Sequence, residues 1–315
     1  MNIHAALADP TFRFYAALAG GALLVAGALL AMLRFGLGRN VDHAWRSYCG
    51  WLIMIPVLLG VLLLGREATI VFFTILGAVG LHEFARATGL WQDRAMYLAA
   101  QLGVPALGVV CLLPDPRLHV PGWYGLFMAL PVYVVAAILT IPILANRTAG
   151  QLQHLALAVI GFLYFGWMFG HLAFLANSDH AYSYLLYLLF AVELNDVAAF
   201  TFGKLLGRRQ LRSNISPKKT WAGALGAVVV SLVLPWLLAF TLPHFGAVER
   251  VILGLLVGIG GQLGDLAISV IKRDIGIKDM GTTIPGHGGV LDRIDSLIYV
   301  APLFLHMVRW FHDLY

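Results

Sequence analysis

The sequence predicts an all-α fold, a polytopic helical bundle integral to a membrane. Of the 315 residues, 60% are hydrophobic and only 12% are charged, whereas soluble domains carry about 25% charged residues. The mean hydropathy is +0.83. Apolar runs near the length that a helix needs to cross a bilayer, about 20 residues, recur along the whole chain. These observations favour one integral membrane domain over two soluble ones.

The apolar runs predict nine or ten transmembrane helices. Residues 1–150 hold the N-terminal helices, and residues 151–315 hold the C-terminal part, where polar residues concentrate. The first run is expected to be an anchor rather than a secretory signal, because Arg34, Arg39 and Arg46 follow it. The runs are 14–33, 49–64, 67–86, 95–113, 123–144, 152–176, 181–203, 221–242, 250–271 and 293–311.

Lysine and arginine are unevenly distributed between the two predicted sides. With the N-terminus outside, the five basic residues on the outer side are Arg13, Arg66, Arg117, Arg250 and Arg309, and the other 16 of the 21 fall inside. Cytoplasmic loops carry such an excess. The pattern predicts that the polar clusters face the cytoplasm, and the expected location is the inner membrane of a bacterium.

Charged residues of both signs crowd into residues 262–296. A dense ionic cluster beside membrane-length apolar runs is costly unless it binds something. Carboxylates bind hard cations such as Mg²⁺, and Lys and Arg bind phosphate oxygens. The stretch therefore predicts a site for a phosphorylated ligand held with Mg²⁺. Its charged residues include Asp265, Lys272, Arg273, Asp274, Lys278, Asp279, Asp292, Arg293 and Asp295, with His287 among them.

The spacing in this stretch predicts how its side chains are presented. Gln262, Asp265, Ser269 and Lys272 follow at steps of three, four and three residues, which share one face of a helix. The segment IPGHGG, with Gly286, His287, Gly288 and Gly289, is expected to form an anion-binding turn. Asp292 is expected to cap the last helix, with Asp295 on the same face.

A second polar cluster lies in the seventh apolar run and the loop 204–220. Glu193 and Asp196 share a helix face beside Asn195. They either mark a site or are buried charges satisfied by neighbouring helices. The loop contains a predicted phosphate clamp, although its lysines also match ordinary cytoplasmic loop charge. The clamp consists of Ser216, Lys218, Lys219 and Thr220.

Other motifs narrow the choice of function. His82, Glu83 and Arg86, at the inner end of the third run, are interpreted as interfacial charges, with the alternative that they line the site. The sequence contains no H-E-x-x-H zinc spacing, no P-loop and no G-x-G-x-x-G fingerprint. It also has no basic amphipathic run with interleaved aromatics, so nucleic acid is not an expected partner.

The run SVIKRDIGIKDMGTTIPGHGGVLDRID at 269–295 resembles the C-terminal signature of the phosphatidate cytidylyltransferase family, also called CDP-diacylglycerol synthases. Its Ser, Lys-Arg, Lys-Asp, His-Gly-Gly and Asp-Arg-x-Asp positions are all present. The upstream segments ND, FGK, GRR and SPKKTW also resemble the family. The match covers less than half of the chain, at its C-terminal end. Family members commonly carry Glu where this chain has Ala222.

The resemblance implies a nucleotidyltransferase that uses CTP, phosphatidate and Mg²⁺ in a membrane and forms CDP-diacylglycerol and pyrophosphate. Asp265 and Asp292 would hold the metal, together with Asp295. The residues expected to act in the chemistry are Asp265, Lys272, Arg273, Lys278, Asp279, His287, Asp292, Arg293 and Asp295. Those expected to bind substrate are Asn195, Asp196, Ser216, Lys218, Lys219, Thr220, Gly288 and Gly289.

Two other functions stay open at this stage. One is a CTP-dependent polyprenol or phytol kinase. The other is a transporter of an anionic lipid or nucleotide, since polar interruptions at membrane depth are typical of secondary transporters. The first half of the chain lacks a matching polar segment, which argues against a transporter built from repeats. The sequence leaves open whether the chain forms a homodimer.

Overall fold

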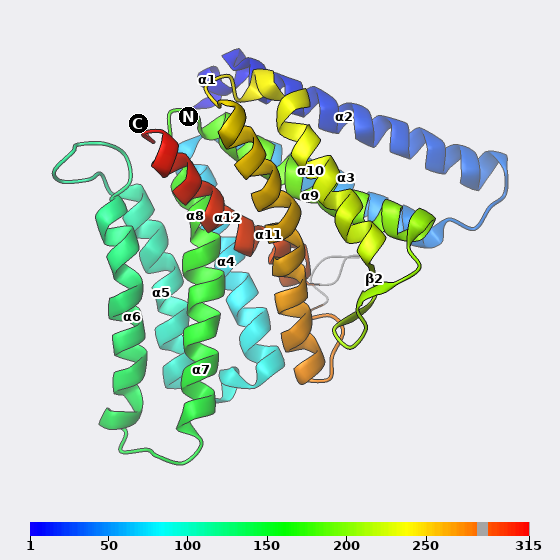
Figure 1. The fold of residues 1–315 in the computed structure, drawn as a ribbon. Coiled ribbons are helices and arrows are strands. Elements are labelled where there is room, and N and C mark those ends of the chain that lie inside the picture. The colour runs from blue at the N-terminus through cyan, green and yellow to red at the C-terminus, as the bar shows by residue number, and fades with distance from the viewer. Residues whose placement is uncertain (282–288, 315) are drawn as a thin grey trace.

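The computed structural model describes residues 1–281 and 289–314, and long helices make up most of this part of the chain (Figure 1). Nine of the described helical spans are long and apolar enough to cross a membrane, which confirms the predicted polytopic fold. They are α2 (Pro10–Ala31, extended by a π-helical turn, Met32–Gly36), α3 (Asp42–Leu64), α4 (Arg66–Thr88), α5 (Arg94–Leu112), α6 (Tyr124–Leu144), α7 (Gln151–Gly161, continued by a π-helical stretch into α8, Phe169–Leu175), α9 (Ala181–Leu206), α11 (Ala247–Asp274) and α12 (Leu291–Phe311).

The eighth apolar run is shorter than the sequence predicts. Expected over 221–242, it forms α10 (Trp221–Leu237) and then a separate 3₁₀ turn, Ala239–Thr241. A six-residue helix, α1 (Ile3–Ala8), precedes the first long helix and is capped by the Asn2 side chain.

Glycines bring α9, α10, α11 and α12 together almost backbone to backbone. A Cβ at Gly223 would lie 2.4 Å from the Ala199 carbonyl oxygen, and one at Gly264 would lie 2.6 Å from the Asp295 carbonyl oxygen. Small residues allow this close approach between membrane helices. The Gly264 contact sets Asp265 of α11 beside the first turns of α12.

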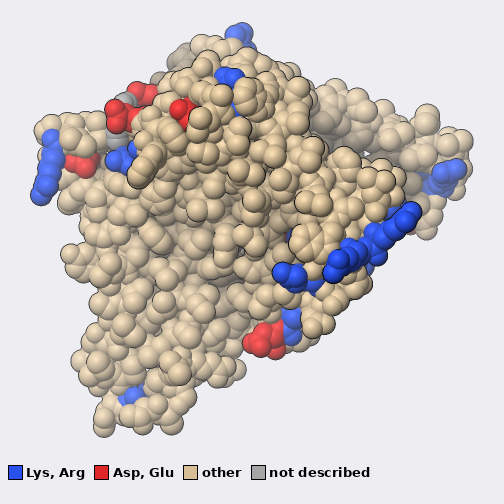
Figure 2. All heavy atoms as spheres, viewed as in Figure 1, with Lys and Arg blue, Asp and Glu red and all other residues tan. Residues whose placement is uncertain are grey.

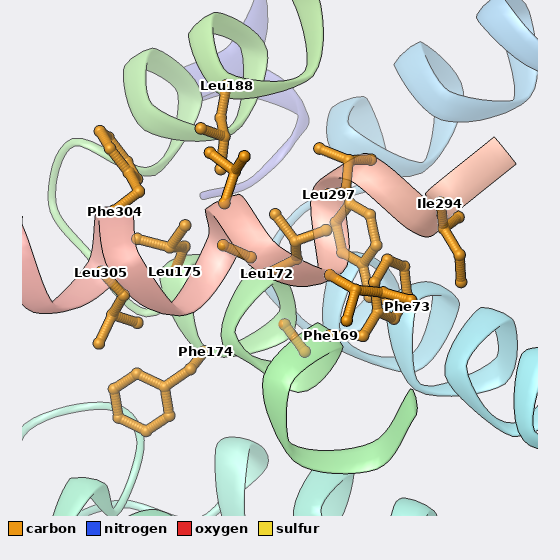
Figure 3. Packing of buried hydrophobic residues seen from close by; sticks show 14 of the residues in the cluster. Phe73, Phe169, Leu172, Phe174, Leu175, Leu188, Ile294, Leu297, Phe304 and Leu305 are labelled. Carbon is orange, nitrogen blue, oxygen red and sulfur yellow. The ribbon is translucent and has the colours of Figure 1, made fainter. Parts of the chain in front are cut away.

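Helix α12 is the central helix of the bundle. Figure 3 shows Phe73 of α4, Phe169 of α8 and Leu188 of α9 among the side chains packed around it. Of its 21 residues, 14 are buried inside the protein, against 3 of the 22 residues of α2. Because most of this helix packs against its neighbours, its position is well fixed, and it supports the charged residues at its start.

The loop predicted between α9 and α10 contains a short hairpin. Strands β1 (Gln210–Arg212) and β2 (Ser216–Thr220) pair antiparallel, with Gln210 opposite Thr220. The Thr220 hydroxyl then accepts a hydrogen bond from the Gly223 N–H at 3.1 Å and caps α10. Figure 2 shows a row of Lys and Arg at the edge of the molecule where this hairpin lies, and a mostly uncharged surface across the middle of the same face.

Contacts between helix ends agree with the alternating directions expected of the spans. At one end, Arg66 donates to the Asn177 side chain at 2.6 Å. At the other, Arg147, which follows α6, reaches Asp93, which precedes α5, at 3.4 Å. The first contact joins the start of α4 to the turn after α8 at the predicted outer side; the second lies at the predicted inner side.

Candidate active site

A pocket of about 680 Å³ lies between α9, α10, α11, the start of α12 and the hairpin. It collects most of the residues that the sequence predicts for a site, although they come from segments far apart in the chain. The predicted residues that line it are Asp196, Lys218, Lys219, Thr220, Asp265, Lys272, Asp279, Asp292, Arg293 and Asp295.

The polar stripe predicted on one face of α11 is present. Gln262, Asp265 and Lys272 all line the pocket. The Ser269 hydroxyl donates to Asp265 Oδ1 at 3.1 Å, one helical turn away. The steps of three and four residues therefore align these groups as the period of the helix requires.

Two lysine–aspartate pairs cross the pocket. Lys219 of β2 lies 2.5 Å from Asp265 of α11, and their side chains are 22% and 29% exposed. Lys272 of α11 pairs with Asp292 of α12, and their side chains are 8% and 5% exposed. The first pair joins the hairpin to α11 and stays accessible. The second is buried between α11 and α12.

Asp292 also holds the backbone that precedes α12. Its Oδ2 accepts hydrogen bonds from the N–H groups of Gly289 at 2.9 Å and Met280 at 3.1 Å. The predicted cap at Asp292 is wrong in detail. The helix begins at Leu291, so Asp292 lies in its first turn, and the N-cap position is Val290, whose side chain has no oxygen.

Three aspartates from three helices repel one another in the pocket. Asp196 of α9, Asp265 of α11 and Asp295 of α12 all line the pocket, and like charges gathered in one site disfavour one another. Ser296 donates its hydroxyl to Asp196 at 3.4 Å and its backbone N–H to Asp295 at 2.8 Å. Such mutual repulsion is relieved by a bound cation.

The chemistry of this carboxylate set fits a divalent metal. Oxygen ligands are those that hard cations such as Mg²⁺ prefer, and the three carboxylates share one pocket with basic residues suited to phosphate. Among the described residues, no three acidic, histidine or cysteine side chains already converge in the arrangement of a metal centre. A metal here would therefore use substrate oxygens or water as further ligands.

One side of the pocket is apolar and was not predicted as part of the site. Trp51 of α3 lines it together with Val197 and Phe200 of α9. Val197 and Phe200 are 57% and 70% exposed, so the pocket reaches the apolar surface of the bundle. Lys204, one turn beyond Phe200, also lines it. Lys204 belongs to the segment FGK, whose resemblance to the family indicated a role for it. No local pattern distinguishes Trp51 from lipid-facing residues.

Five predicted site residues lie off the pocket wall: Asn195, Ser216, Arg273, Lys278 and Gly289. Asn195 is fully buried and accepts a hydrogen bond from Ser231 at 3.1 Å, so it joins α9 to α10. Arg273 donates to the backbone carbonyl oxygens of Ile215 and Ile277 and ties the end of α11 to the hairpin. The predicted residues His287 and Gly288 lie outside the described residues.

Glu83 is not the interfacial charge that the sequence suggests. It is only 7% exposed, and its carboxylate accepts backbone hydrogen bonds from Val290 at 3.2 Å and Leu291 at 3.0 Å. The signal was a carboxylate inside an apolar run. The neighbouring His82 contacts the Tyr97 hydroxyl at 2.9 Å, and Arg86 is exposed.

Comparison with known proteins identifies the family. Residues 45–311 match the family model described as "Cytidylyltransferase family". The chain belongs to the cytidylyltransferase family. It is 30% identical over 255 residues to a phosphatidate cytidylyltransferase of Staphylococcus aureus strain COL, covering 80% of this chain and 94% of the relative. It is also 30% identical over 281 residues to a phosphatidate cytidylyltransferase of Bacillus subtilis strain 168, covering 86% and 99%.

A third relative carries no assigned activity. The chain is 32% identical over 250 residues to an uncharacterized protein, YnbB, of Escherichia coli strain K12, covering 78% of this chain and 80% of that one. The family match spans α3 to α12, so it includes both the polar pocket and its apolar side.

Proposed function

We propose that this cytidylyltransferase transfers the cytidylyl group of CTP to phosphatidate and forms CDP-diacylglycerol and pyrophosphate. The observation that carries the proposal is the pocket itself, in which carboxylates and lysines line one part and exposed apolar side chains line another. An acceptor with a phosphate head and acyl chains matches both parts. The relatives named phosphatidate cytidylyltransferase support the same reaction.

The reaction requires positioning and neutralisation of charge more than a proton acceptor. A phosphate oxygen of phosphatidate attacks the α-phosphorus of CTP and forms a new P–O bond. The bond from the α-phosphorus to the oxygen that bridges it to the β-phosphate breaks, and pyrophosphate leaves. Phosphate monoesters have a second pKa of about 6, so the attacking group is largely ionised at neutral pH. The site must bring two anions together.

The basic residues of the pocket supply that neutralisation. Lys218 and Arg293 are exposed on its wall and are assigned to phosphate oxygens. Lys219 becomes available when a ligand replaces it at Asp265. Arg273 and Lys278 are exposed beside the pocket and would meet the outer part of the nucleotide.

Asp265 and Asp295 are the residues assigned to hold Mg²⁺, with Asp196 beside them. When bound, the metal would neutralise charge on the triphosphate. Asp292, the third predicted ligand, already accepts two backbone N–H groups and pairs with Lys272. Its carboxylate would reach a metal only after Lys272 shifts toward the substrate.

A labelling assay separates this function from its alternatives. Purified protein in lipid nanodiscs would receive phosphatidate and CTP labelled at either the α- or the γ-phosphate. Transfer of the α-label to lipid, lost on addition of EDTA, is the expected result. Transfer of the γ-label, tested with polyprenol and phytol as well, would identify a kinase, and no labelled lipid with any acceptor would favour transport.

We also propose that the pocket faces the cytoplasm of a bacterial inner membrane. The excess of basic residues on the side of the hairpin supports this orientation. In a background lacking Cys49 and Cys111, Arg212→Cys should resist an impermeant thiol reagent in spheroplasts and react after lysis. Arg117→Cys, on the opposite side, is the matched control and should react before lysis. The reverse pattern would overturn the orientation.

A further inference from the structure

Glu83 joins the N-terminal part of the chain to the start of α12. It lies in the last turns of α4, far in sequence from the residues that line the pocket and not itself one of them. Its two carboxylate oxygens accept one hydrogen bond each from the consecutive N–H groups of Val290 and Leu291. These donors are at the N-cap and first position of α12, which has no side-chain cap of its own.

A carboxylate at this place stabilises the start of the helix in two ways. The first N–H groups of a helix have no partner within it, and the N-terminal end of the helix dipole attracts negative charge. Most caps come from the residue just before the helix. Here the cap comes from another helix, so it also fixes the position of α12 relative to α4.

The backbone at two glycines lies directly against the same carboxylate. A Cβ at Gly281 would lie 2.7 Å from Glu83 Oε1, and one at Gly289 would lie 2.5 Å from Oε2. Neither distance is compatible with a side chain unless Glu83 moves. The backbone on both sides of residues 282–288 therefore approaches one buried acid.

The first turns of α12 carry the groups that Glu83 would position. Asp292, Arg293 and Asp295 all line the pocket, and Asp292 follows directly after Leu291. A shift of this turn would move all three relative to Asp265. Misplacement of reacting groups by about 1 Å can cost on the order of 100-fold in rate.

We infer that Glu83 is a positioning residue for cytidylyl transfer, acting through the Val290 and Leu291 N–H groups to hold Asp292, Arg293 and Asp295 in the pocket. The inference rests on the proposed function. Glu83 touches neither substrate nor metal in this role. Its carboxylate fixes the positions of Asp292, Arg293 and Asp295, the residues assigned to contact them.

The test compares Glu83→Gln and Glu83→Asp with Glu67→Gln, an exposed acid at the other end of the same helix. The glutamine sets an NH₂ group against one of the two N–H donors. We expect kcat for CDP-lipid formation to fall about 100-fold in Glu83→Gln, with the KM for CTP changed less than about threefold. Glu83→Asp should recover part of the rate, and Glu67→Gln should retain all of it. Wild-type kcat in a folded Glu83→Gln protein would overturn the inference.

A pair of substitutions tests the contact itself. Gly289→Ala should lower kcat because its Cβ meets the Glu83 carboxylate. Adding Glu83→Asp withdraws that carboxylate by one methylene, so the double variant should be more active than Gly289→Ala alone. Losses that simply add would contradict a shared contact, because coupled neighbours are non-additive.

Hydrogen exchange gives a readout that does not depend on activity. The backbone amides of 289–292 should exchange faster than in wild type in Glu83→Gln. In Glu67→Gln they should exchange at the wild-type rate. Faster exchange with an unaltered kcat would reduce Glu83 to a helix cap and refute the positioning role. If wild-type protein makes no CDP-lipid, the proposed function fails, and the exchange data still decide whether Glu83 holds the start of α12.

Discussion

The two lysine–aspartate pairs of the pocket have the same chemistry and opposite surroundings. Lys272 and Asp292 are almost fully buried between α11 and α12, and Asp292 accepts two further backbone hydrogen bonds. Lys219 and Asp265 are more than one fifth exposed and join the hairpin to α11. Both pairs line the pocket, but the first is almost enclosed by helices, and the second is more open to a ligand.

This difference assigns different roles to the pairs. Removing one partner of a buried pair leaves an uncompensated charge, so Lys272–Asp292 is suited to hold α11 and α12 together. A partly exposed pair costs little to open. Lys219 is therefore able to leave Asp265 and bind phosphate, and Asp265 is able to bind a metal. The comparison predicts that substitutions in the first pair act on stability and activity, and those in the second on activity alone.

The largest expected effect is in Lys272→Met. It leaves Asp292 buried with two backbone donors and no cation, so we expect a loss of about 3–5 kcal/mol in unfolding free energy. Thermal unfolding in detergent, followed through thiol exposure, should show a clearly lower midpoint than wild type. Lys219→Met is the matched control, with a loss below about 1 kcal/mol. Equal losses in the two variants would end the distinction between the pairs.

Asp265→Asn should remove activity while leaving stability unchanged. The amide keeps the size of the side chain but weakens its binding to a metal and to Lys219. Because even supporting partners of metal ligands contribute 10–100-fold, turnover should fall by more than about 100-fold. CDP-lipid formation would be measured across a Mg²⁺ titration in preparations of matched monodispersity. Turnover within a few-fold of wild type would remove Asp265 from the metal assignment.

Close helix approach offers a third test, at intermediate size. A Cβ at Gly264 would meet the Asp295 backbone at 2.6 Å, so Gly264→Ala should separate α11 from α12 near the carboxylates. Overpacking of this kind costs about 1–3 kcal/mol, and activity should fall with stability. Gly276→Ala is not a suitable control, because Gly276 has a positive φ of 74°. Gly260→Ala, with its nearest neighbour at 3.4 Å, is the better one and should be close to wild type.

Lys219→Met should have a smaller effect on catalysis. A hydrogen bond to a charged group contributes about 1.5–3 kcal/mol. Lys219 must leave Asp265 to bind CTP, and the loss of that ion pair offsets part of the gain. We therefore expect the KM for CTP to rise about tenfold, equivalent to 1.4 kcal/mol. Steady-state kinetics at saturating phosphatidate would measure it. An unchanged KM would mean that Lys219 stays with Asp265 when CTP binds.

Local periodicity was sufficient to predict one wall of the pocket. The steps from Gln262 to Lys272 placed their side chains on one face of α11, and the structure confirms that face. Apolar run length predicted the membrane spans in the same way, because both follow from the geometry of a single helix. The end of α10 was wrong by several residues, since the sequence 238–242 is apolar whether or not it is helical.

Contacts between distant segments could not be predicted. Trp51 of α3 lines the pocket beside residues of α9, and Glu83 of α4 contacts the start of α12, but neither has a local pattern that separates it from an interfacial residue. Asn195 shows the opposite case. Its neighbour Asp196 faces the pocket, so a step of one residue turns Asn195 toward Ser231 of α10. Which neighbour faces the ligand is decided by how the helices pack.

The smallest expected effect concerns Ala222, where the resemblance to the family leads us to expect Glu. Ala222 is the second residue of α10, half-buried, and follows directly after the Lys219–Thr220 end of β2. It does not line the pocket. A carboxylate there would stabilise the N-terminal end of α10 by about 0.3–1 kcal/mol and help order the lysines of β2.

We therefore predict that Ala222→Glu raises kcat/KM with phosphatidate about threefold, within that range of energies. Ala222→Gln, equal in size and uncharged, is the matched control and should show little gain. Both would be assayed for CDP-lipid formation at matched folded concentration across a CTP titration. Lower activity of Ala222→Glu at every concentration would mean that this junction is adapted to alanine, and the acceptor should then be sought among other phosphorylated lipids.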